Sequence, residues 1–161
     1  MKRCNTITGL LVLLCVSAGY TQPAIGNRAP EISLIDINGI VQNLSETKRM
    51  IVLVDFWASW CVPCRRSNRE LLPLYKKYKN KGFEIFAISI DQNLDDWKKA
   101  IKADKIKWKQ VVDAEGLNGP AVTSWGIEQL PTSYLLDKEG IIIAIDPAKK
   151  DIEKYLKKSL H

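Results

Sequence analysis

The chain has 161 residues and a formal net charge of +6, with 24 lysine and arginine residues against 18 aspartate and glutamate residues. That length suits one domain, which can bury a core without support from metals or disulfides. The basic residues are spread over amphipathic segments such as "LYKKYKNKG" and "DIEKYLKKSLH", a pattern typical of solvated helix faces that argues against nucleic-acid binding.

Residues 1–21 have the order of a secretory signal peptide. Lys2 and Arg3 come first, an apolar run follows at 10–16, and small residues follow at 17–19. The apolar run is shorter than the roughly 20 residues that span a bilayer as a helix, so cleavage is favoured over a retained membrane anchor. We therefore expect an exported protein of the periplasm or cell envelope, with any membrane association confined to this segment.

Removal of the signal peptide would leave a mature domain over residues 22–161 with a single cysteine pair. Cys4 and Cys15 would be lost, and Cys61 and Cys64 would remain. The residue before Cys15 is not the small one that lipid attachment generally requires, so lipidation there is the less favoured alternative. The remaining pair would meet an oxidising compartment.

The first half of the mature chain predicts a hairpin and a β-α-β unit. Alternation around an Asn-Gly turn predicts a β-hairpin over residues 31–44. The apolar, β-branched run at 50–58 shows little alternation and predicts a central strand covered on both faces. Apolar residues at helical spacing predict a helix from 62 to about 79, and 83–91 is a second buried strand. We expect these two strands to be parallel, with a right-handed crossover.

The second half alternates helices and strands in the same way. We expect, in order, a helix at 94–104, a short strand at 107–113, a short helix at 119–126, a hairpin at 132–146 and a terminal helix at 149–160. No repeat or linker interrupts the pattern. The chain is therefore expected to form a single α/β domain with a central mixed sheet flanked by helices.

Cys61 and Cys64 stand where the first buried strand gives way to a helix. The N-terminus of a helix carries about half a positive charge and unpaired N–H donors, which favour a thiolate at Cys61. Cys61 is then the exposed nucleophile of disulfide exchange, and Cys64, about one turn further on, is the resolving cysteine. Arg65 and Arg66 add positive charge nearby, and Pro63 suits the first helical turn.

Other roles for the pair are weaker. A disulfide that closes so small a loop constrains the unfolded chain little, so a purely structural bridge is disfavoured. Zinc needs four ligands, whereas the chain has one histidine, His161, and no second cysteine pair in the mature domain. We expect no metal and no cofactor.

The segment "VDFWASWCVPCR" resembles the active site of thioredoxin-fold proteins. Over residues 26–160 the chain resembles the exported TlpA/ResA-like thiol-disulfide oxidoreductases, which are related to the AhpC/TSA proteins. The resemblance also takes in the segments "APEISLIDING", "KGFEIFAISID" and "GIEQLPTSYLLDKEG", and the residues Trp97 and Trp108. It implies a thioredoxin-like domain that acts on protein disulfides.

The resemblance also implies roles for residues around the pair. Pro131 matches the cis-proline that faces the two cysteines, and Leu130 the residue before it, whose backbone groups can bind an extended substrate peptide. Trp60 matches the tryptophan that flanks the pair. These residues would hold the substrate beside the reacting sulfurs.

Asp55 matches the buried acid that lies behind the second cysteine in many thioredoxins. It would accept the proton of Cys64, with its pKa raised by desolvation. The sequence departs from the exported relatives at Ser67, where many of them carry a glutamate, and Glu70 is an alternative acceptor one turn further on. A solvated position at the edge of a strand is the competing interpretation of Asp55.

The dipeptide between the cysteines predicts the direction of electron flow. Strong oxidants of this fold often carry a histidine there, whereas Val62 and Pro63 offer no donor to a thiolate. We expect a reductant of substrate protein disulfides, supplied with electrons by a membrane protein. A thiol peroxidase and a binding module without redox turnover are the two alternatives, and the sequence lacks the Pro-x-x-x-Thr-x-x-Cys run typical of such peroxidases.

Overall fold

The structure is a computed structural model that describes residues 22–160. The predicted signal peptide, Cys15 and His161 lie outside the described residues. The elements are, in chain order, β1 (Ser33–Asp36), β2 (Val41–Asn43), η1 (Leu44–Thr47), β3 (Ile51–Trp57), α1 (Val62–Tyr78), η2 (Lys79–Lys81), β4 (Phe83–Ser89), α2 (Leu94–Ala103), β5 (Lys109–Val112), η3 (Gly116–Asn118), α3 (Pro120–Trp125), β6 (Thr132–Leu136), β7 (Ile142–Ile145) and α4 (Lys149–Ser159).

The strands form one mixed sheet in the order β2-β1-β5-β4-β3-β6-β7. β3 and β4 are parallel, as are β4 and β5, and the other neighbouring strands are antiparallel. β1 and β2 pair as the N-terminal hairpin, with Ser33 opposite Asn43. This arrangement confirms the predicted fold class, the hairpin and the parallel pair of buried strands.

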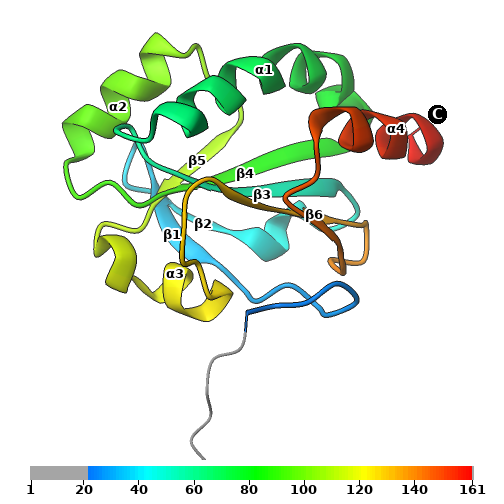
Figure 1. Cartoon of the computed structure of the whole chain (residues 1–161), viewed down its shortest axis with the longest axis horizontal. Helices are drawn as coiled ribbons and strands as arrows, with labels where there is room; N and C mark the ends of the chain where they lie inside the picture. The colour runs from blue at the N-terminus through cyan, green and yellow to red at the C-terminus, as the bar shows by residue number, and fades with distance from the viewer. Residues whose placement is uncertain (1–21, 161) are drawn as a thin grey trace, which may run out of the picture.

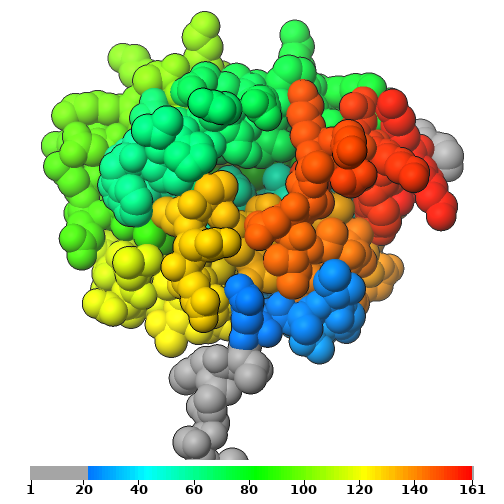
Figure 2. Space-filling model, in the orientation of Figure 1, coloured from blue at the N-terminus to red at the C-terminus, as the bar shows by residue number. Residues whose placement is uncertain are grey.

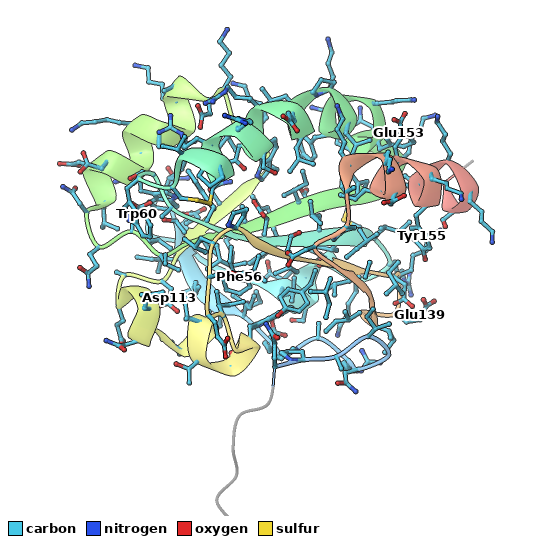
Figure 3. All side chains as sticks on the ribbon, viewed as in Figure 1. Phe56, Trp60, Asp113, Glu139, Glu153 and Tyr155 are labelled. Carbon is cyan, nitrogen blue, oxygen red and sulfur yellow. A yellow bond between two sulfur atoms is a disulfide. The ribbon has the colours of Figure 1, made fainter. Side chains whose placement is uncertain are left out.

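Helices cover both faces of this sheet (Figure 1). α1, α2 and α4 lie on one face, and α3 lies on the other. All seven residues of β3 are buried, which explains why its sequence shows no alternation of apolar and polar residues. Phe56 of β3 points towards α3, where its ring lies 5.7 Å from that of Trp125 (Figure 3).

The strand order brings three chain segments to one edge of the sheet. β3 and β4 are parallel, so both end at this edge. β6 is antiparallel to β3 and begins there, with Thr132 paired to Phe56. The loop after β3, which carries the cysteines, therefore lies beside the residues that precede β6.

The structure differs from the sequence prediction mainly in short elements. The 3-10 turns η1, η2 and η3 were not predicted, because each is a single turn without an apolar period.

Pro73 lies inside α1, which continues through it to Tyr78. Within residues 22–160, no helix is long and apolar enough to cross a membrane.

Candidate active site

The cysteine pair caps the N-terminus of α1. Cys61 is the N-cap residue, and the backbone N–H of Cys64 donates a hydrogen bond to Cys61 Sγ over 3.2 Å. Pro63 lies in the first turn, where a missing N–H leaves no intrahelical bond unmade. Cys61 and Cys64 form a disulfide, with their Cα atoms 5.3 Å apart. The structure is thus that of the oxidised pair.

The predicted exposure of Cys61 is wrong for this oxidised form. Cys61 is 5% exposed and Cys64 is 1% exposed, so both sulfurs are buried and Cys61 is the more accessible. The exposed residues are its neighbours: Trp60 is 64% exposed and Val62 is also exposed. Figure 3 shows Trp60 close to the disulfide at the start of α1. Exposed apolar side chains therefore surround the two buried sulfurs.

Asp55 is buried in the middle of the sheet, which rules out the solvated strand edge. It pairs in register with Ala87 of β4 and Ser133 of β6. Burial raises the pKa of Asp55 from 3.8 to about 7, and the negative charge of Asp146 adds to the increase. Its carboxyl group therefore titrates near neutral pH.

Asp55 and Glu70 line the same cavity. This cavity, of about 190 Å³, lies between the sheet, α1 and α4, and Ser67, Ser133 and Lys149 add polar atoms to its wall. The two acids that the sequence offered as alternative proton acceptors therefore belong to one site. Asp55 lies at the buried end and Glu70 is exposed on α1.

The loop before the pair is held by a buried carboxylate that the sequence analysis did not single out. Asp91, just after β4, accepts hydrogen bonds from Ser59 N over 2.9 Å and from Ser59 Oγ over 2.6 Å. It also accepts one from Ser89 Oγ over 2.6 Å. Ser59 lies two residues before Cys61, so these bonds fix the approach of the chain to the disulfide.

Arg65 holds the same loop from the other side. Its guanidinium donates to Ser59 O over 3.1 Å and forms an ion pair with Asp104, which α2 carries at its C-terminus. The hydrogen bond with Asp104 raises the pKa of Arg65. Of the two arginines that follow the cysteines, Arg65 is therefore paired with a buried carboxylate and holds the loop, whereas Arg66 is exposed.

The Leu130–Pro131 peptide bond is cis. Pro131 directly precedes β6, at the edge of the sheet where β3 ends. Figure 2 shows the segment around residue 130 adjoining the segment that leads into α1 on one face of the molecule. The structure thus brings Trp60, Pro131 and the disulfide to one region, with Asp55 beneath α1.

The described part of the chain contains no cluster of side chains that could bind a metal ion. Between residues 22 and 160 no group of three or more histidine, cysteine, aspartate or glutamate side chains is placed to hold a metal ion.

Comparison with known proteins agrees with this geometry. Residues 25–145 match the AhpC/TSA family. The thiol-disulfide oxidoreductase ResA of Bacillus thuringiensis subsp. konkukian is 32% identical in an alignment that covers 92% of each chain. The thioredoxin domain of a thiol-disulfide oxidoreductase from Bacteroides vulgatus is 37% identical, with a TM-score of 0.78 over 86% of this chain and 99% of that one. A thiol:disulfide interchange protein from Bacteroides sp. is 37% identical, with a TM-score of 0.77 over 86% of this chain and 91% of that one. The chain therefore belongs to the AhpC/TSA family and is one of its thioredoxin-fold thiol-disulfide oxidoreductases.

Proposed function

We propose that the protein is exported and reduces disulfides of substrate proteins, with Cys61 as the nucleophile. The observation that carries this proposal is the hydrogen bond from Cys64 N to Cys61 Sγ at the N-terminus of α1. A backbone donor and a helix N-terminus directed at one sulfur stabilise its thiolate once the pair is reduced. Cys61 is also the more accessible of the two sulfurs.

The reaction has two exchange steps. The Cys61 thiolate attacks one sulfur of the substrate disulfide, whose bond breaks to release a first thiolate and leave a mixed disulfide. Cys64 then loses its proton and attacks the sulfur of Cys61, which releases the second substrate thiolate. The substrate gains two electrons, and the Cys61–Cys64 disulfide is formed again.

Asp55 accepts the proton that Cys64 loses. A general base is most effective when its pKa lies near the working pH, and burial brings the pKa of Asp55 to about 7. The cavity shared with Glu70 offers this proton a polar route to solvent. In this scheme Asp55 is the acceptor and Glu70 lies at the outlet.

The surface around the pair binds the substrate polypeptide. Trp60 supplies an exposed aromatic side chain beside the sulfurs. Backbone groups at Leu130 and Pro131 would pair with an extended substrate segment, as in the addition of a strand. This combination selects for polypeptide substrates with an accessible disulfide.

Two features support a reductant that works outside the cytoplasm. Val62 and Pro63 give the Cys61 thiolate no side-chain hydrogen-bond donor. The reduced pair is therefore less stabilised and gives up its electrons more readily. Residues 1–21 have the order of an export signal. In the periplasm or cell envelope the oxidised pair would be reduced again by a membrane protein that relays electrons from the cytoplasm.

Reduction of insulin tests the proposal. The mature chain with dithiothreitol should reduce insulin much faster than dithiothreitol alone, and Cys61→Ser should remove the acceleration. Cys64→Ala should instead accumulate a mixed disulfide, because the resolving sulfur is missing. Wild-type protein that gives no acceleration, or Cys61→Ser protein that retains it, would refute the proposed function.

A further inference from the structure

Asn68 is a buried polar side chain that the proposed reaction does not yet use. It is 0% exposed, and neither its amide nitrogen nor its amide oxygen has a hydrogen-bond partner among residues 22–160. Burial of an amide without partners is unfavourable, and most buried polar groups in proteins are paired. The other residues on the buried face of α1 beyond Asn68 are leucines and tyrosines (Leu71, Leu74, Tyr75, Tyr78). An apolar residue would therefore serve packing better at this position.

The spacing on α1 places Asn68 next to the reacting pair. Asn68 follows Cys64 by four residues, and both belong to the buried face of the helix. Residues four apart are neighbours on a helix surface, and helical side chains lean towards the N-terminus. The amide of Asn68 therefore leans over the turn that carries Cys64.

The redox state of the pair decides whether this amide has a partner. In the disulfide form Cys64 Sγ is bonded to Cys61 Sγ and offers little to a donor. Reduction by a dithiol breaks this bond, passes two electrons and two protons to the pair, and leaves the donor as a disulfide. Cys64 then becomes a buried thiol or thiolate, which needs a hydrogen-bond partner of its own.

We propose that the side-chain amide of Asn68 hydrogen-bonds the sulfur of Cys64 when the pair is reduced, and so sets the balance between the two redox forms. The inference rests on the proposed function, since it concerns the resolving cysteine of that reaction. The amide nitrogen can donate to a thiolate and the amide oxygen can accept from a thiol. The amide is unpaired in the oxidised form, which is unfavourable, and is hydrogen-bonded in the reduced form. The reduced form is therefore stabilised relative to the oxidised form, and the protein is a milder reductant than it would be with leucine at this position.

The test compares two variants with a matched control. Asn68→Leu removes the amide but keeps a branched side chain, and Asn68→Ala removes it and leaves a void. Asn80→Leu makes the same chemical change at an exposed asparagine in η2. Each protein is equilibrated with reduced and oxidised glutathione at pH 7, and the thermal stability of both redox forms is measured.

Both Asn68 variants should lower the equilibrium constant for reduction of the pair about tenfold, which corresponds to about 30 mV. The reduced form should lose stability relative to the oxidised form, and Asn80→Leu should change neither quantity. A purely structural Asn68 would shift both redox forms equally and leave the equilibrium constant within about twofold of wild type, which would overturn the inference. Failure of the proposed function is seen separately, as a wild-type pair that does not equilibrate with glutathione at all.

Discussion

Replacement of Asp55 by asparagine should remove a specific pH dependence of stability. In the folded protein burial raises the pKa of Asp55 from 3.8 to about 7. Between these two values the unfolded chain is ionised at this position while the folded chain still holds its proton, so stability falls as pH rises. Each unit of difference between the folded and unfolded pKa corresponds to about 1.4 kcal/mol. Ionisation of this carboxyl group alone therefore lowers the free energy of unfolding by at most about 4 kcal/mol at pH 7. Asp55→Asn keeps a buried polar group of the same shape but cannot ionise.

Urea denaturation of the oxidised proteins at several pH values measures this difference. The free energy of unfolding of Asp55→Asn minus that of wild type should rise by a few kcal/mol between about pH 4.5 and pH 7 and level off above that. Because the other acids of the chain are common to both proteins, their titration cancels in the difference. Parallel pH profiles for the two proteins would show that Asp55 is ionised at an ordinary pKa, and would remove the basis for its role as proton acceptor. Loss of the acceptor should also slow insulin reduction near neutral pH.

Three further changes test other parts of the site. Trp60→Ala should alter stability by no more than about 0.5 kcal/mol, because the side chain is exposed, but should lower kcat/KM for a protein substrate about tenfold. Asp91→Asn replaces one of the two carboxylate oxygens that accept from Ser59 and Ser89 by an NH2 donor, and should cost about 2 kcal/mol of stability by urea denaturation. It should also slow insulin reduction, and unchanged kinetics would contradict the role of Asp91 in holding the loop. In stopped-flow measurements hydrogen peroxide should oxidise the Cys61 thiolate no faster than it oxidises dithiothreitol, and rapid consumption would favour a peroxidase.

The local pattern of the sequence was sufficient to predict the strand and the helix that position the cysteine pair. The buried run of β3 has no alternation, because helices cover both faces of the sheet, and this gave a correct central strand. The position of the cysteines between that strand and α1 followed directly, as did Cys61 at the helix N-terminus. Burial of Asp55 and the cis bond before Pro131 were expected only from resemblance to known proteins.

Pairing over long distances in the chain escaped the sequence analysis. Ser59 and Asp91 are 32 residues apart, and Arg65 and Asp104 are 39 residues apart. Such contacts depend on how the folded chain brings distant loops and helices together, and no local periodicity of the sequence predicts that. The burial of Cys61 was also missed, because a position at a helix N-terminus does not by itself determine how exposed a side chain is.

The reduction potential of the Cys61–Cys64 pair is the decisive quantity for the proposed exchange reaction. Equilibration of the mature protein with glutathione, followed by the counting of free thiols, measures it. We expect a pair that exchanges readily and has a potential closer to that of thioredoxin, about −270 mV, than to that of DsbA, about −120 mV. A potential near that of DsbA would reverse the direction of electron flow, and a pair that does not exchange would refute disulfide exchange as the function of the protein.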